Sequence, residues 1–112
     1  MAVLITSTSA LSVAANSKSA DQVSGQYQYT GKGRYTLVAR ASATGLNVTF
    51  ASGGISPVND QVVTFTGTAG ALSAVDHVVV SQLMNGGRNE LTFRNTTSST
   101  ITVDSQLWFD PM

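Results

Sequence analysis

The fold is decided by residues 86–111, GGRNELTFRNTTSSTITVDSQLWFDP, in which two alternating runs flank a Thr/Ser cluster. Apolar residues recur at two-residue intervals in both runs, and the expected inward set is Leu91, Phe93, Ile101, Val103, Leu107 and Phe109. Successive side chains of a β-strand point to opposite faces. The pattern therefore predicts two strands with one buried and one polar face, which is typical of antiparallel sheets.

The rest of the chain repeats this pattern. Further alternating runs occur at residues 3–5, 11–13, 34–41, 46–51 and 61–65. The run HVVVSQL, residues 77–83, is almost continuously apolar, and we interpret it as a central strand buried on both faces. Turn signals separate the runs, and they lie at residues 30–33, Gly45, Gly54 and Asn85-Gly86. Residues 70–78 are the one stretch that suggests a short helical turn.

Turn signals at intervals of about eight to twelve residues are typical of β-sandwiches and barrels. We predict an all-β fold, an antiparallel two-sheet sandwich of eight or nine short strands, and the pattern favours a single jelly roll. A chain of 112 residues is expected to form one domain, residues 1–112. Residues 1–16 are expected to be an N-terminal arm or edge strands.

The composition combines ordinary hydrophobicity with very few charges. Apolar residues make up 42% of the chain and charged residues only 11%, against about a quarter in a typical domain. This balance argues against disorder and against a coiled coil. The formal net charge is zero, which is easier to explain when much of the surface faces other protein molecules. Nucleic acid is not an expected partner, because its binders carry a basic surface.

The chain contains no cysteine, so disulfides and thiolate metal sites are excluded. Residues 1–16, MAVLITSTSALSVAAN, have no basic segment and only interrupted apolar runs, so we predict no signal peptide. No run approaches the roughly 18 apolar residues of a membrane helix. We therefore expect a soluble protein that is made in a host cytoplasm and does not contact a membrane.

Few residues are suited to chemistry. General acid–base catalysis needs titratable groups close together, and the only His, His77, stands beside Asp76 with no nucleophile motif nearby. We predict that the protein is not an enzyme and that it needs no cofactor. The acidic and amide residues that could hold calcium are scattered, and they are Asn59, Asp60, Asp76, Asp104 and Asp110. A loop calcium at one end of the sandwich and ordinary turn chemistry both remain open.

Two groups of residues are candidate contact sites. The stretch YQYTGKGRY carries Tyr27, Tyr29, Lys32 and Arg34, which could stack on a sugar or contact nucleic acid, or could simply form a hairpin with a solvated basic tip. In the last run Trp108 falls on the polar side with Asp104 and Gln106. Trp is enriched at binding hot spots, so Trp108 is a candidate contact to a partner, with an intrachain role as the alternative.

The whole chain resembles the small single jelly rolls of the tumour-necrosis-factor-like kind found in bacteriophage capsid-decoration, cement and minor capsid proteins. The resemblance rests on MAVLITSTSA at the start, the Ser/Thr/Ala/Gly bias and the closing stretch GRNELTFRNTTSSTITVDSQLWFDP. It implies a structural virion protein that forms a homotrimer, binds a major capsid protein and stabilises the shell.

A second resemblance is to jelly-roll carbohydrate-binding modules. The stretches GRYTLVARAS and GGRNELTFRN are similar to two strands of those modules. This resemblance implies a lectin-like protein with a glycan as its ligand, and it is the alternative to the virion interpretation.

Overall fold

Eight β-strands and one short 3-10 helix make up the secondary structure of residues 2–65, 72 and 77–112, the part that the computed structural model describes. In chain order they are β1 (Val3–Val13), η1 (Gly25–Tyr27), β2 (Tyr29–Thr30), β3 (Gly33–Ala41), β4 (Leu46–Ser52), β5 (Ile55–Val62), β6 (Val78–Met84), β7 (Gly87–Asn95) and β8 (Ile101–Pro111).

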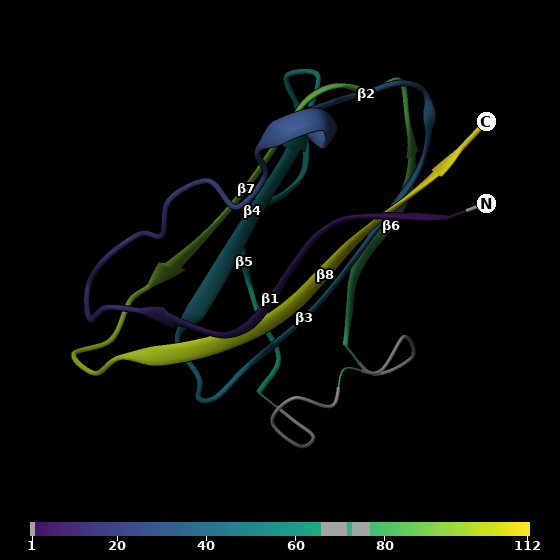
Figure 1. Ribbon diagram of the computed structural model, residues 1–112. Helices are drawn as coiled ribbons and strands as arrows, with labels where there is room; N and C mark the ends of the chain where they lie inside the picture. The colour runs from purple at the N-terminus through teal and green to yellow at the C-terminus, as the bar shows by residue number, and fades with distance from the viewer. Residues whose placement is uncertain (1, 66–71, 73–76) are drawn as a thin grey trace.

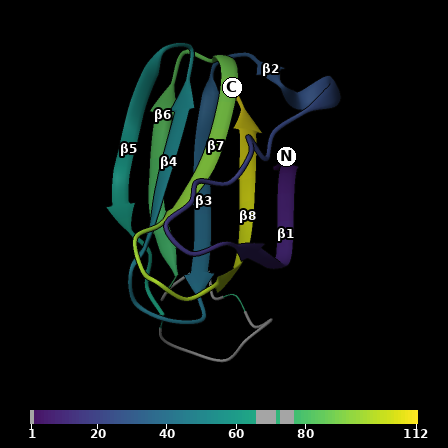
Figure 2. The same ribbon diagram turned by 90° about the vertical axis from the view of Figure 1, so that its left-hand side faces the viewer.

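The strands form two antiparallel four-stranded sheets that pack face to face (Figure 1). One sheet has the order β1-β8-β3-β6 and the other the order β2-β7-β4-β5. The predicted all-β, two-sheet antiparallel sandwich is confirmed, and the strand order is compatible with a jelly roll. In Figure 2, β5 and β6 lie on one flank of the sandwich and β1 on the other.

The core lies between the sheets and is built from the residues that the two-residue period places inward. Tyr35 is fully buried, and its ring centroid lies 5.9 Å from that of Phe50 and 4.8 Å from that of Phe109. Leu91 and Leu107 are also fully buried. These rings join β4 of one sheet to β3 and β8 of the other, and their burial stabilises the packing of the two sheets.

Two strand predictions were wrong. The run at 77–83 was expected to be a central strand, but β6 ends its sheet, and Val78 and Leu83 are exposed. The run at 61–65 was expected to turn Val63 and Phe65 to the same side. Instead β5 ends at Val62, Val63 is buried and Phe65 is exposed. The helical turn suggested for residues 70–78 falls almost wholly outside the described residues.

Glycine backbones meet closely where loops cross between the sheets. The Asn85-Gly86 turn joins β6 of one sheet to β7 of the other, so it is a crossing connection and not a hairpin. Gly86 has a φ of 87°, and a Cβ atom there would collide with the backbone carbonyl of Gly31. A Cβ atom on Gly53 would collide with the carbonyl of Gly86. Only glycine permits both this conformation and this approach.

An irregular segment, residues 16–28, covers the outer edge of β7 beyond the very short strand β2. The N–H of Leu91 donates to Oδ1 of Asp21 (3.0 Å), and the N–H of Phe93 donates to Oγ of Ser19 (2.9 Å). The N–H of Gln22 donates back to the carbonyl of Leu91 (2.8 Å). Side chains thus act as acceptors where a neighbouring strand would supply carbonyls, which satisfies the edge and blocks further pairing.

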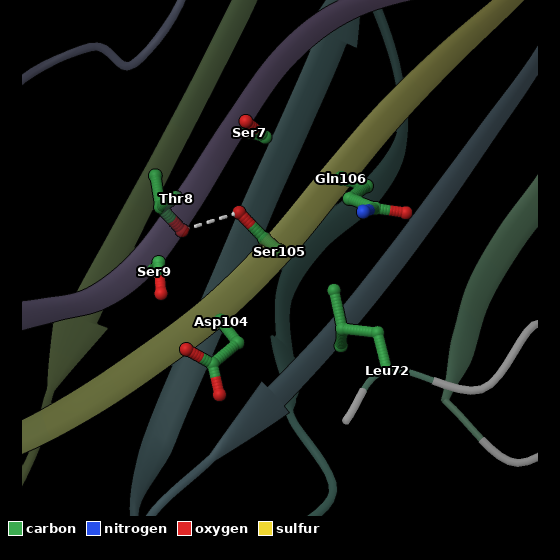
Figure 3. A pocket seen from close by; sticks show the side chains of 7 residues that line it. All are labelled: Ser7, Thr8, Ser9, Leu72, Asp104, Ser105 and Gln106. Carbon is green, nitrogen blue, oxygen red and sulfur yellow. Dashed lines mark hydrogen bonds between the residues drawn. The ribbon is translucent and has the colours of Figure 1, made fainter. Parts of the chain in front are cut away.

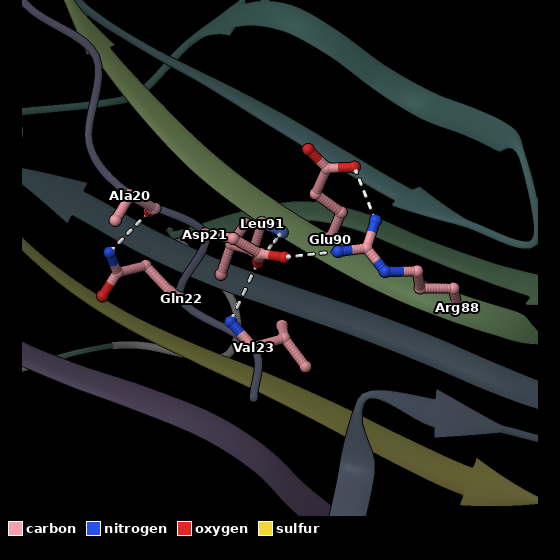
Figure 4. Close-up of polar contacts among 7 residues, drawn as sticks. All are labelled: Ala20, Asp21, Gln22, Val23, Arg88, Glu90 and Leu91. Carbon is pink, nitrogen blue, oxygen red and sulfur yellow. Dashed lines mark hydrogen bonds and ion pairs between the residues drawn. The ribbon is translucent and has the colours of Figure 1, made fainter. Parts of the chain in front are cut away.

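Asp21 holds this cover in place, as Figure 4 shows. Its Oδ1 accepts the N–H groups of both Val23 and Leu91, each at 3.0 Å, and its Oδ2 lies 3.8 Å from Nη2 of Arg88. We expect Asp21→Ala to lower the free energy of unfolding by about 1–3 kcal/mol, because it leaves the Leu91 N–H without its acceptor.

Chemical denaturation followed by circular dichroism measures this change. Glu90→Ala is the matched control, since Glu90 is exposed and forms only a 3.7 Å ion pair with Arg88, so its effect should stay within about 0.5 kcal/mol. Equal effects of the two substitutions would show that Asp21 does not anchor the segment.

Candidate functional site

Trp108 lies on the outer face of the β1-β8-β3-β6 sheet, because its neighbours Leu107 and Phe109 point into the core. It stands opposite Leu4 on one side and Thr36 on the other. Its side chain is half-buried, and Nε1 donates to Oε1 of Gln106 at 3.2 Å. The indole N–H therefore has an acceptor within the chain, and the ring is partly available to a ligand or a partner.

Arg34 is the one other predicted contact residue on this outer face. It lies opposite Asp110 and Leu83, one row along the strands from the row that contains Trp108 and Thr36. Diagonal neighbours of this kind are about 7–8 Å apart, within reach of long side chains. The fold thus brings Arg34 and Trp108, which are far apart in the sequence, onto one surface.

The other predicted contact residues lie elsewhere. Tyr29 belongs to β2 of the second sheet, opposite Arg88, and is 66% exposed. Tyr27 is in η1 and packs partly against the core. Lys32 is exposed in the loop between β2 and β3, and its carbonyl accepts the N–H of Met112 at 3.2 Å. The five candidates therefore form no single aromatic and basic cluster.

A polar hollow of about 340 Å³ opens beside the same outer face, between β1 and β8 (Figure 3). It is lined by Ser7, Thr8, Ser9, Leu72, Asp104, Ser105 and Gln106. The hydroxyls of Thr8 and Ser105 are hydrogen-bonded at 2.7 Å. The lining offers hydroxyl, amide and carboxylate groups, which is the chemistry that recognises the hydroxyls of a polar ligand.

Asp104 joins the hollow to the backbone of β1. Its Oδ1 accepts the N–H of Ala10 at 2.8 Å, at a β-bulge where Ala10 has a φ of 52°. Its Oδ2 lies 3.9 Å from Nη1 of Arg40, and both residues are buried. Asp104 is therefore held by the fold, and its carboxylate has a structural role.

The titratable residues are spread over the molecule. His77 is buried just before β6, and Asp76 lies outside the described residues. Asp60 is on β5, whereas Asp104 and Asp110 are on β8 of the opposite sheet. Among residues 2–65, 72 and 77–112, no group of three or more His, Cys, Asp or Glu side chains is placed to hold a metal ion. Over the same residues no helix is long and apolar enough to cross a membrane.

The flank formed by β5 and β6 carries the surface that the sequence analysis missed. Four of its side chains are exposed although apolar: Ile55 (57%), Val62 (69%), Val78 (39%) and Leu83 (47%). β5 and β6 contact each other and run in opposite directions (Figure 2). We call these two strands with their exposed apolar side chains the apolar flank.

A groove of about 380 Å³ lies at one end of the apolar flank. Ser52, Gly53 and Ile55 line it from one sheet, and the segment 82–86 and Lys32 line it from the other. The signal for this surface was the run HVVVSQL itself. A continuous apolar run is expected in a central strand, and on an edge strand it leaves apolar side chains without cover.

No protein-family model matches the chain, and neither a curated protein nor a solved structure is detectably similar to it.

Asp60 and Arg94 form an exposed ion pair on the outer face of the second sheet. Nε of Arg94 donates to Oδ1 of Asp60 at 3.0 Å, and Nη2 donates to Oδ2. These hydrogen bonds from Arg94 lower the pKa of Asp60 below its usual range. Because the folded pKa is lowered, the pair stabilises the fold above the ordinary Asp range, and this contribution is lost as pH falls through the lowered pKa.

We expect Arg94→Gln to raise the pKa of Asp60 toward its ordinary value, since it removes the guanidinium that holds the carboxylate charged. An NMR titration of the Asp60 carboxyl carbon measures the change. Arg88→Gln removes a similar cation that pairs instead with Asp21 and Glu90, so it should leave the pKa of Asp60 unchanged. An Asp60 titration that is the same in wild type and Arg94→Gln would contradict the assigned cause.

Proposed function

We propose that this protein is a structural subunit that acts by binding and not by catalysis, specifically a virion protein of the capsid-decoration, cement or minor capsid class. Its partners are copies of itself and a major capsid protein, and its place is the virion surface. The observation that carries the proposal is the apolar flank, where Ile55, Val62, Val78 and Leu83 are exposed on a chain with only 11% charged residues.

Physical chemistry favours association at such a surface. Fully burying one Val, Leu or Ile side chain contributes about 1.5–3 kcal/mol, and the four exposed side chains belong to two adjacent strands. Leu83 stands opposite Arg34 on the outer face of one sheet and Val62 opposite Asn47 on the outer face of the other, so the two strands expose apolar side chains on both sides, and exposed apolar groups of this kind can mark contact surfaces. A net charge of zero removes long-range repulsion between copies.

Assembly would convert weak contacts into firm attachment. A closed oligomer presents several identical surfaces to a shell, and linked sites bind with a high effective concentration. The resemblance to tumour-necrosis-factor-like decoration proteins favours a homotrimer for this oligomer. Residues 3–13 are placed as the edge strand β1, paired with β8 of the same chain, and this leaves the sandwich as one rigid block for such contacts.

Self-association is the first test of this proposal. We expect the purified protein to be oligomeric by light scattering coupled to size exclusion, and Leu83→Ser to weaken association by about tenfold or more, because a buried Leu contributes roughly 1.5–3 kcal/mol. Tyr29→Ser is the matched control, since Tyr29 is 66% exposed on β2, which lies at the other edge of its sheet from β5.

Two results would argue against the proposal. One is a wild-type protein that stays monomeric at all concentrations and does not sediment with purified capsids. The other is a gene neighbourhood without any capsid or terminase gene, which would remove the virion assignment while leaving the assembly surface in place.

Glycan binding is the second candidate function, and the placement of Trp108 favours it. A half-buried indole lies on a sheet face with Thr36 opposite and Gln106 hydrogen-bonded to its N–H, and the polar hollow is lined by the same Gln106. An aromatic face flanked by amide and hydroxyl groups suits the apolar face and the hydroxyls of a sugar ring.

Trp108 is the only Trp in the chain, so its fluorescence reports directly on this surface. If the glycan function holds, a soluble oligosaccharide should change the emission saturably, and calorimetry should show binding that Trp108→Ala abolishes. Under the virion proposal we expect no saturable response to any of a panel of oligosaccharides. Oligomer formation should lower the solvent exposure of the Trp108 ring only when the outer face is an interface.

A further inference from the structure

Asn85 and Gly86 form the connection from β6 to β7, and they combine three features that favour a reaction between neighbouring residues. The side chain of Asn85 is exposed. Gly86 has no Cβ atom, so no side chain hinders the approach of another group to its backbone nitrogen. Within the described part of the chain, the N–H of Gly86 is hydrogen-bonded to no other group. This nitrogen is therefore free to react with the amide carbon of the Asn85 side chain.

We propose that Asn85 is a site of spontaneous deamidation in the folded protein. The backbone nitrogen of Gly86 attacks Cγ of Asn85 and forms a new N–Cγ bond. The Cγ–Nδ2 bond breaks, and ammonia leaves with the proton of the Gly86 N–H. Because both groups belong to neighbouring residues, this step is intramolecular and needs no catalyst.

Water completes the reaction. The first step leaves a five-membered succinimide ring that joins Asn85 to Gly86. Water adds to one of the two carbonyl carbons of the ring and breaks its bond to the nitrogen. One opening gives aspartate, and the other gives isoaspartate, in which the main chain runs through the side-chain carbon. The balance is one water consumed and one ammonia released.

Each of the other asparagines lacks at least one of the three features. Asn89 and Asn95 are buried, and their amides donate to backbone carbonyls. Asn59 is exposed, but the N–H of Asp60 that follows it donates to Oγ1 of Thr49 at 2.9 Å. In every one of these cases the next residue carries a Cβ atom that crowds the nitrogen, and these next residues are Ser17, Val48, Asp60, Glu90 and Thr96.

The two products differ in their effect on the fold. Gly86 lies so close to the carbonyl of Gly31, and Gly53 so close to the carbonyl of Gly86, that neither glycine could carry a Cβ atom. Isoaspartate adds one atom to the main chain at this point, whereas aspartate leaves the main chain unchanged. Because β6 and β7 belong to different sheets, the added atom must disturb a connection between the sheets. We therefore expect isoaspartate to destabilise the fold.

Both products place a carboxylate in the groove of the apolar flank. Asn85 lines this groove together with Lys32 and Leu83. The formal net charge, which is zero for the unmodified chain, becomes negative. The reaction therefore changes a neutral amide into an anion beside Lys32. It concerns the chemistry of the chain itself and depends on neither of the two functions proposed above.

Mass spectrometry of the folded, full-length protein measures the reaction. At mildly alkaline pH we expect a gain of about 1 Da at Asn85, at a rate about tenfold or more above that at Asn59, since only Asn85 precedes a free nitrogen without a neighbouring Cβ atom. Asn85→Gln is the matched control. It keeps an exposed amide, but its longer side chain must close a larger ring, so the gain in mass should disappear on the same timescale.

Stability tells the two products apart. Asn85→Asp carries the new charge without the added main-chain atom, and it should unfold at nearly the same denaturant concentration as the wild type. The isoaspartate form, isolated by chromatography, should unfold at a lower concentration than Asn85→Asp. Circular dichroism checks that each protein is folded before the measurement.

Fast deamidation at Asn85 in the folded protein, with loss of the reaction in Asn85→Gln, supports the inference. Equal rates at Asn85 and Asn59 overturn it. A reaction at Asn85 that occurs only in denaturant also overturns it, because the native connection would then hold the two groups apart. An isoaspartate form as stable as Asn85→Asp overturns the expected strain at Gly86.

Discussion

An open β-sheet must dispose of the backbone N–H and C=O groups along its outermost strands, and this constraint shapes much of the molecule. Residues 16–28 cover β7, where Asp21 and Ser19 supply the acceptors that a strand would otherwise supply. The buried carboxylate of Asp104 accepts the N–H that the bulge in β1 frees at Ala10. The polar side chains of Asp21, Ser19 and Asp104 are thus engaged in hydrogen bonds to backbone N–H groups of β7 and β1. β6 ends its sheet with a register shift opposite Leu37 and Val38 of β3.

Buried polar residues close the ends of the inward rows. Asn89 and Asn95 stand two residues beyond Leu91 and Phe93 in β7 and share their inward side. The Asn89 amide donates to the carbonyl of Tyr27 (3.0 Å), and its Oδ1 accepts from Oγ of Ser52 (2.7 Å). The Asn95 amide donates to the carbonyls of Val13 and Ser99. Each amide ties a loop to the core, and a buried amide with its hydrogen bonds satisfied specifies one loop arrangement over others.

The surface divides into parts with different chemistry. The outer face that carries Trp108, Arg34 and Thr36 mixes aromatic, cationic and hydroxyl groups, whereas the apolar flank carries aliphatic side chains on two neighbouring strands. A polar ligand suits the first surface and another protein surface suits the second. Leu83 of the flank stands opposite Arg34 on the same outer face as Trp108, whereas Ile55 and Val62 belong to the other sheet. The virion and glycan proposals therefore concern adjoining surfaces of one sandwich.

Local sequence pattern was enough to give the all-β class, the inward rows of β3, β4, β7 and β8 and the position of Trp108 on the polar side, because the two-residue period depends only on backbone geometry. Asn89 and Asn95 share the two-residue period of Leu91 and Phe93, so the same pattern places them inward, but their polar side chains kept them out of the expected core. The local sequence pattern did not give the order of the strands in the sheets. The sequence of β6 is typical of a central strand, but β6 pairs only with β3 among the described strands and therefore lies at an edge. The pairing of Val3 with Phe109, across the whole chain, places β1 at the other edge. The apolar flank and the separation of Tyr29 from Trp108 follow from those long-range pairings, which no local pattern encodes.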